Sequence, residues 1–254
     1  YIINTISTIG VTSFFIMSGF LLFRKPVGKE RIKKQIFRIL KLYGCWTIVY
    51  LPLDIYKYLK DGLNFPQAIV DFVQKAIFNG TYYHMWYLPS LIVAICVVYI
   101  MKNRRYILIT VTAGLMIIGI FTDTYGISFP KVYYTIFLTT RNGLFMGSFL
   151  VAIGKCLADY ESKLRNLKKW KLILPVAIVA LYVEGGLISK FDSERIINIA
   201  FTSVIVSIIL VTIMIGLPQI KASKNVRNMS TVIYLCHPCI MVIINLSDHL
   251  GIFL

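Results

Sequence analysis

This chain contains eight successive apolar runs. Each run is long enough, or nearly long enough, to cross a bilayer. They cover about residues 3–23, 39–58, 86–101, 106–122, 136–155, 171–189, 196–217 and 229–247. A helix needs about 20 apolar residues to span the hydrocarbon, and fewer where neighbouring protein covers it. Hydrophobic residues make up 57% of the chain, and the mean hydropathy is +0.74, above the usual range of soluble domains. The pattern predicts an all-α, polytopic integral membrane helix bundle.

The net charge of +16 is concentrated in alternate loops between these runs. The loops after the first, third, fifth and seventh runs hold 20 of the 27 lysines and arginines, whereas the other loops hold six. Cytoplasmic loops of membrane proteins carry such an excess, so this charge is a topology signal and not a sign of nucleic-acid binding. We expect the basic loops in the cytoplasm and both ends of residues 1–254 on the outside.

The start of the sequence is typical of a fragment. Residue 1 is Tyr and an apolar run begins at once, without a signal-peptide pattern. Eight spans with both ends outside imply a preceding helix that starts in the cytoplasm. We therefore expect residues 1–254 to be a single domain taken from a longer protein.

Two charged residues in the apolar runs are candidates for a functional site. Arg141 lies about five residues inside the fifth run and Glu184 about five residues from the outer end of the sixth, so both are expected roughly 7–8 Å below the outer surface. A guanidinium in hydrocarbon costs a few kcal/mol, so it faces a cavity or partner, or else reaches the headgroups. An Arg141–Glu184 pair is expected, either as a structural ion pair or as a pair that orients a substrate.

The last run contains a histidine beside a proline. Pro238 cannot donate to the carbonyl of Tyr234, which predicts a kink and a free carbonyl beside Tyr234 and His237. His237 is either a general base or a histidine bonded within the bundle. Cys236 and Cys239 have C-x-x-C spacing, but no βαβ pattern surrounds them and no acidic ligand accompanies His237, so neither redox nor metal chemistry is predicted.

Two other segments are amphipathic or aromatic. Residues 29–42 form a basic interfacial helix, which either attracts anionic headgroups or receives a polyanionic cytoplasmic cosubstrate. The outer loop 59–85 is predicted to contain a surface helix after Phe65-Pro66. It leads into an interfacial aromatic belt that includes Trp86 and Tyr87.

Five stretches in order resemble the acyltransferase family 3 membrane proteins. They are TSFFIMSGFLL at residues 12–22, KKQIFRILKLY at 33–43, HMWYL at 84–88, RNGLFMG at 141–147 and YLCHP at 234–238. The sequences of residues 84–89 and 140–147 are most similar to those of one branch, the membrane half of vancomycin-resistance serine racemases. The family core has about ten helices, so the resemblance implies that the first and last helices lie outside these 254 residues.

The resemblance implies an enzyme of the bacterial plasma membrane. Family members move acyl groups, commonly acetyl from acetyl-CoA, onto hydroxyls of envelope glycans or similar molecules. Acyl-CoA is then the cosubstrate, expected to meet Lys34, Arg38 and Lys41. We expect His237, Arg141, Glu184 and Tyr234 to be catalytic, and His84, Trp86, Tyr87 and Asn142 to lie near the acceptor.

The serine racemase branch keeps a second hypothesis open, in which the membrane half takes up serine or another small amino acid. Arg141 would then bind the carboxylate of the amino acid. A third possibility is a purely structural bundle. The sequence predicts the lipid bilayer and a small-molecule or glycan acceptor as partners, and leaves the acceptor, the acyl group and the oligomeric state open.

Overall fold

The structure of the protein is a computed structural model that describes residues 2–82, 84–127, 130–165, 170–191, 199–218, 229 and 232–240. Every regular element in these residues is helical, which confirms the predicted all-α class. The chain forms two compact units, residues 1–217 and 218–254. The described residues of the second unit include the helical stretch 232–240.

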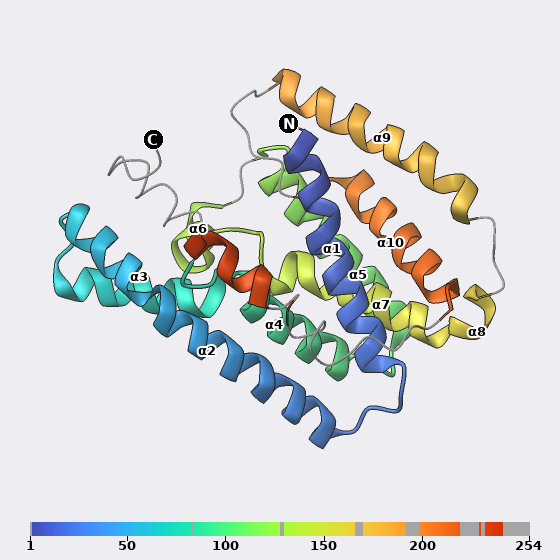
Figure 1. Ribbon diagram of the computed structural model, residues 1–254, viewed down its shortest axis with the longest axis horizontal. Coiled ribbons are helices and arrows are strands. Elements are labelled where there is room, and N and C mark those ends of the chain that lie inside the picture. Colours follow the sequence, from blue (N-terminus) through green and yellow to red (C-terminus); the bar gives the residue numbers. More distant parts are fainter. Residues whose placement is uncertain are drawn as a thin grey trace. The chain divides into compact units, whose positions relative to one another are not determined.

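The elements of the first unit are shown in Figure 1. They are α1 (Ile2–Phe23), α2 (Lys29–Lys60), α3 (Phe65–Phe78), α4 (Tyr87–Ile100), α5 (Arg105–Asp123), α6 (Lys131–Phe137), the π-helical turn η1 (Gly143–Gly147), α7 (Ser148–Asp159), α8 (Glu161–Leu164), α9 (Trp170–Phe191) and α10 (Phe201–Gly216). Among the described residues, α2, α5 and α9 are long and apolar enough to cross a membrane, and Thr8–Phe23, α4 and α10 are shorter apolar helices. Six of the predicted apolar runs therefore coincide with apolar helices.

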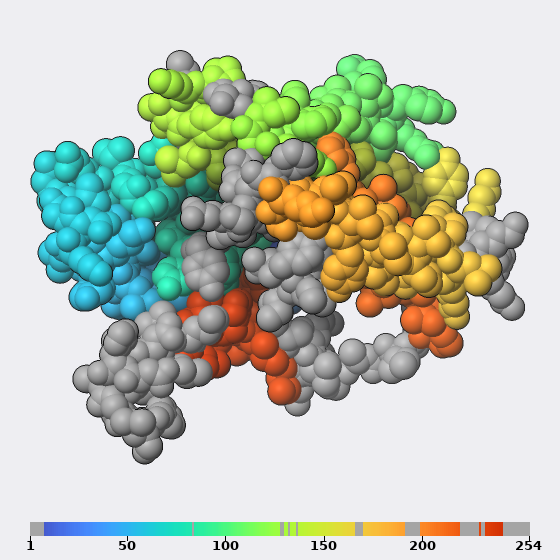
Figure 2. All heavy atoms as spheres, turned by 90° about the horizontal axis from the view of Figure 1, so that it is seen from above, coloured from blue at the N-terminus to red at the C-terminus, as the bar shows by residue number. Residues whose placement is uncertain are grey.

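Apolar side chains on the outer helices point away from the protein. Ile48 on α2 is 70% exposed and Val176 on α9 is 69% exposed. The gold atoms of α9 form part of the outer surface in Figure 2. A protein in water avoids large contiguous patches of this kind, whereas hydrocarbon is a good solvent for them. The exposed faces of α2 and α9 are therefore suited to lipid.

The core of the first unit forms where α1 packs against α7 and α10. Gly19 on α1 and Gly154 on α7 are both buried where the two backbones come close. A Cβ atom at Gly19 would lie 3.0 Å from the Cα of Val151 and closer still to its carbonyl oxygen. Small residues permit this approach, which is how helices associate in membranes. On the α10 side, the hydroxyls of Thr12 and Ser207 are hydrogen-bonded.

The segment after α1 forms one helix of 32 residues, α2. The predicted interfacial helix 29–42 and the predicted span 39–58 are thus continuous, although Pro52 lies inside the helix. The expected surface helix is confirmed as α3, which begins with a reciprocal capping box between Asn64 and Gln67. It lies beside the C-terminal part of α2, where the Tyr58 hydroxyl donates to Asp71 at 2.8 Å.

The fifth predicted span is not one helix. It was expected over 136–155, but α6 ends at Phe137, Leu138 has a φ of +62°, and the helix resumes only at Gly143. Arg141 therefore lies on irregular backbone before the helix and not a turn and a half inside it. The physical reason is a strong capping residue at position 142.

Candidate functional site

Asn142 determines where the helix that follows Arg141 begins. Its side-chain oxygen accepts the backbone N–H groups of Leu144 at 3.0 Å and Phe145 at 3.2 Å, as an N-cap residue does. Its amide nitrogen donates to the Tyr133 hydroxyl at 2.8 Å and the Thr139 carbonyl at 2.9 Å. Asn142 thus holds the backbone next to Arg141 in place, and its contact with a substrate stays a prediction.

A polar pocket of about 430 Å³ lies beside Arg141. It is lined by residues of α2, of α3 and the loop that follows it, and of the segment before η1: Asp54, Lys57, Lys75, Asn79, Gly80, Thr81, Tyr82, Trp86, Thr139 and Arg141. The carbon at the centre of the Arg141 guanidinium lies 5.1 Å from the centroid of the Trp86 ring, a cation–π arrangement. The guanidinium therefore faces a pocket of a size typical for small-molecule sites.

Gly80 brings the loop after α3 onto the pocket. Its φ of +79° lies in the left-handed region, where glycine is favoured. A Cβ atom here would lie 2.6 Å from the backbone nitrogen of Trp86, so a side chain would push the loop away from the backbone at Met85 and Trp86. The turn at Gly80 thus sets the position of Trp86 and of the pocket wall.

Asp54 places an acidic group in this pocket. The residue is 8% exposed, and its Oδ2 atom is buried without a hydrogen-bond partner among the described residues. The side-chain oxygen of Asn79 is buried in the same way. Of the cations in the pocket, Lys75 forms an ion pair with Asp71 at 2.5 Å. Asp54 is the only acid in the apolar run 39–58, and an ionisable residue in a span is a site signal that our sequence analysis missed.

The other residues expected near the acceptor are not among those that line the pocket. His84 is buried against Tyr50, with ring centroids 5.2 Å apart, and Tyr50 stacks on Tyr82 at 4.5 Å. Tyr87 faces α1, where it is bonded to the Ser18 hydroxyl at 2.9 Å. Of the four residues expected near the acceptor, the indole of Trp86 is the one that lines the pocket.

Glu184 does not pair with Arg141, so the expected ion pair is wrong. Its carboxylate accepts the backbone N–H groups of Phe201 at 3.0 Å and Thr202 at 2.8 Å, together with the Thr202 hydroxyl. The Tyr125 hydroxyl also donates to it, at 2.5 Å. Burial, and then this hydrogen bond, raise the pKa of Tyr125 above its ordinary value. A carboxylate at a helix N-terminus is stabilised by the free N–H groups and the helix dipole, which explains the preference of Glu184 for α10.

His237 and Tyr234 lie in the second unit. The Nδ1 atom of His237 is 2.7 Å from the Tyr234 carbonyl, and because a carbonyl only accepts, Nδ1 is the donor. Pro238 has no N–H to offer this carbonyl, which we expected to be free, and the histidine ring replaces the missing backbone donor. In the neutral ring the lone pair then lies on Nε2. This tautomer is the one that a general base acting through Nε2 requires.

Three bases predicted to meet a cosubstrate lie on one exposed face of α2. Lys34, Arg38 and Lys41 are spaced by four and three residues, which places them on the same side of a helix. Asp54 lies 20 residues beyond Lys34, or about 30 Å along the helix, which is close to the thickness of the hydrocarbon core. The basic face and the polar pocket therefore lie at opposite ends of one helix.

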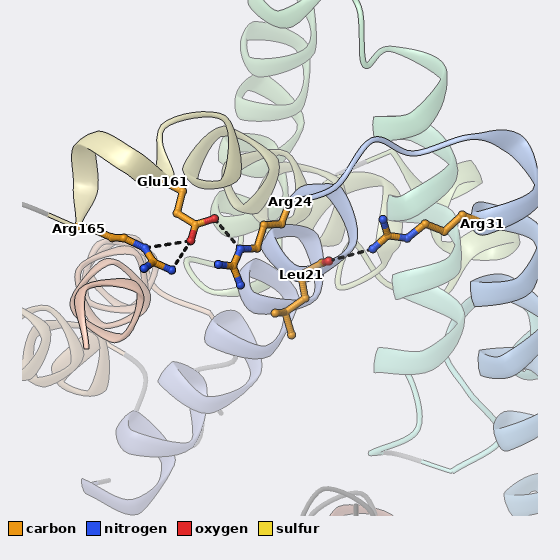
Figure 3. Close-up of polar contacts among 5 residues, drawn as sticks. All are labelled: Leu21, Arg24, Arg31, Glu161 and Arg165. Carbon is orange, nitrogen blue, oxygen red and sulfur yellow. Dashed lines mark hydrogen bonds and ion pairs between the residues drawn. The ribbon is translucent and has the colours of Figure 1, made fainter. Parts of the chain in front are cut away.

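Glu161 forms ion pairs that connect the end of α1 with α8. Figure 3 shows its carboxylate between Arg24 and Arg165, each with an N–O distance of 2.6 Å. Burial alone would raise the pKa of Glu161, but its hydrogen bonds to the two guanidiniums outweigh burial and lower the pKa. Arg31 donates to the Leu21 carbonyl at 3.4 Å on the same side of the protein. These contacts fix the loops that carry most of the predicted cytoplasmic charge.

No group of three or more His, Cys, Asp or Glu side chains within the described ranges could hold a metal ion. Three features define the class of polytopic helical membrane domains. They are apolar helices of membrane-crossing length, apolar side chains that face outward, and a polar pocket at the end of a long helix. The chain belongs to the acyltransferase 3 family, described as an acyltransferase domain, and matches it over residues 1–252. The family predicted from the sequence motifs is thereby confirmed.

Three similar proteins are racemases of enterococci. The chain is 24% identical to a serine/alanine racemase of Enterococcus gallinarum over 253 residues, 92% of this chain and 35% of that protein. Two amino-acid racemases of Enterococcus faecalis are 30% identical over 174 residues and 25% identical over 259 residues, or 63% and 95% of this chain. The matches span 24% and 36% of those two proteins, so the chain covers about a quarter to a third of these curated relatives. No solved structure matches the chain.

Proposed function

We propose that this chain is the membrane domain of an enzyme that transfers an acyl group, most simply acetyl from cytoplasmic acetyl-CoA, to a hydroxyl of a cell-envelope glycan or a similar acceptor. The acceptor oxygen attacks the thioester carbonyl, the C–S bond breaks, and CoA leaves as the thiol. The observation that carries the proposal is the arrangement along α2, with a basic face at one end and a polar pocket about 30 Å away. In this proposal eight or more spans cross a bacterial plasma membrane with the basic loops in the cytoplasm.

In this proposal, different residues act at the two sides of the membrane. Lys34, Arg38 and Lys41 hold the phosphates of acyl-CoA, because clustered cations neutralise such a polyanion. Arg141 polarises or anchors an acyl or acceptor oxygen at the pocket. His237, oriented by the Tyr234 carbonyl, takes the proton of the acceptor hydroxyl and passes it to the CoA thiolate. Glu184 keeps a positioning role at the start of α10 and is not assigned to the chemistry.

Labelled acetyl-CoA offered to proteoliposomes of the full-length protein tests this proposal. We expect transfer of label to a hydroxylated acceptor, and a higher KM for acetyl-CoA in Arg38→Gln, because a phosphate contact is lost. Arg141→Gln should lower kcat with little change in that KM. Lys190→Gln, at the predicted outer end of α9, is the matched loss of a positive charge and should change neither constant. Absence of CoA-dependent transfer in the wild type would contradict the proposal.

A second candidate function is uptake of serine or a small amino acid, supported by the names of the racemase relatives and by a pocket that offers a guanidinium to a carboxylate. The same proteoliposomes separate it from acyl transfer. Serine flux that does not depend on acyl-CoA, and that Arg141→Gln abolishes, supports the carrier.

A further inference from the structure

The basic loops that follow the first, third and fifth apolar runs contact one another in the first unit. Lys102, in the turn between α4 and α5, donates to the Val27 carbonyl in the loop after α1 at 3.2 Å. Arg24 at the end of α1 forms its ion pair with Glu161 of α8. Contacts of this kind gather bases that are far apart in the sequence onto the side predicted to be cytoplasmic.

Two of these bases converge on Tyr160, between α7 and α8. The guanidinium of Arg105, at the start of α5, donates to the Tyr160 hydroxyl at 2.5 Å, and its central carbon lies 4.5 Å from the centroid of the ring. The Nζ atom of Lys163 lies 5.7 Å from the same centroid. Tyr160 and Lys163 are exposed, so a ligand can reach both cations from outside the protein.

The acids of this segment are already engaged by other bases. Asp159 forms an ion pair with Lys155 at 2.7 Å, and Glu161 is shared by two arginines. Arg105 and Lys163 form no ion pair within the described ranges. Two cations beside a neutral ring make a positively charged spot, which attracts an anion.

The surface next to Arg105 indicates an anion that carries hydrocarbon. The following residues of α5, Tyr106 and Ile107, are exposed, and so is Val111 one turn further along the helix. A soluble anion gains nothing from this apolar surface, whereas the tails of a phospholipid cover it. Basic pockets at the cytoplasmic ends of membrane helices bind the phosphates of lipid head groups. A guanidinium held in a fixed orientation suits two phosphate oxygens, and a flexible lysine can turn toward the same group.

We propose that Arg105 and Lys163 bind the phosphate of an anionic phospholipid in the leaflet that faces the basic loops, with the lipid tails on the exposed side of α5. Tyr160 is a positioning residue, because its hydroxyl holds the guanidinium of Arg105. The site shares no residue with the pocket beside Arg141 or with the basic face of α2, so the inference does not depend on the proposed reaction.

Native mass spectrometry of the purified full-length protein in a neutral detergent tests the proposal, because it resolves the binding of single lipids. Phosphatidylglycerol is the probe, and phosphatidylcholine with the same tails is the control, since its choline neutralises the phosphate. We expect the first phosphatidylglycerol molecule to bind at least about tenfold more tightly than phosphatidylcholine. CoA is added as a soluble source of phosphate and should not displace the lipid.

Matched variants separate a specific site from the general attraction of a basic surface. Arg105→Gln should weaken binding of the first phosphatidylglycerol about tenfold. Arg104→Gln removes the same charge from the preceding, exposed residue and should weaken it far less. Tyr160→Phe keeps every charge and the ring but loses the hydroxyl, and should weaken binding about fivefold. Lys163→Gln changes an exposed side chain, so it keeps the test open if Arg105→Gln fails to fold.

Three outcomes overturn the proposal. Equal affinities for the two lipids mean that the phosphate is not recognised. Equal losses in Arg104→Gln and Arg105→Gln, with a Tyr160→Phe variant that binds as the wild type does, mean that only the general charge of the surface acts. Displacement of phosphatidylglycerol by CoA assigns the two cations to a soluble phosphate and not to a lipid.

Discussion

Replacing Gly19 by alanine tests the close packing of α1 on α7. The new Cβ atom would lie 3.0 Å from the Cα of Val151 and nearer to its carbonyl oxygen, whereas carbon atoms prefer separations of about 3.5–4.0 Å. Because the obstacle is backbone, no rotamer change relieves it, and the helices must separate by about 1 Å. Overpacking of this kind costs about 1–3 kcal/mol, and we expect the upper end. The melting temperature should fall by roughly 6–12 °C.

Gly10 provides a matched control on the same helix. A Cβ atom there meets nothing within 4 Å, so Gly10→Ala adds the same methyl group without a clash. Its effect should stay below about 1 kcal/mol and tend to stabilise, because alanine favours the helix. Thermal unfolding of the purified protein, followed by circular dichroism, compares the two. A Gly19→Ala variant that melts within 2 °C of the wild type, where roughly 6–12 °C is expected, would refute the packing argument.

Two further predictions concern carboxylates outside the pocket. Glu184→Gln should lower the free energy of unfolding by about 1–2 kcal/mol, because it removes a charged cap from the start of α10. A variant that loses activity but keeps the wild-type melting temperature would indicate that Glu184 is catalytic instead. Glu161, whose pKa is lowered from its ordinary value of 4.5, should contribute about 1 kcal/mol above that pH and lose this contribution as the pH falls through its folded-state pKa. Urea unfolding at several pH values should therefore show Glu161→Gln weakening the protein at neutral pH but not in acid. Equal destabilisation at both pH values would contradict this assignment.

The positions of the apolar helices could be predicted from the sequence, because long apolar runs have few alternatives in a bilayer. The surface helix α3 was predictable for a related reason, since Pro66 and an amphipathic pattern mark its start. The continuity of α2 was less evident. Its basic first half and apolar second half look like different segments, although no helix-ending residue separates them.

The site was harder to predict because it depends on local capping and on one loop. The residues after Arg141 are apolar, so the sequence predicted one continuous helix there and not a break. Asn142 followed by Gly143 is an N-cap signal that could have located the break. The pairing of Arg141 with Glu184 failed because matched depth does not determine which partner is nearest, and the start of α10 offered Glu184 several donors. Asp54 and Asn79 lie on different elements and yet line the same pocket, and such a juxtaposition is not visible in a hydropathy pattern.

Pro52 gives α2 a mechanical property that its length alone would not. Because proline has no amide hydrogen, the rung that would join it to the carbonyl of Ile48 is missing, and helices bend most easily where a rung is absent. Asp54 and Lys57 lie just past this weak point, while Lys34 and Arg38 lie well before it. A bend at Pro52 would move Asp54 and Lys57 relative to the first half of α2, so the pocket and the basic face need not move as one rigid body.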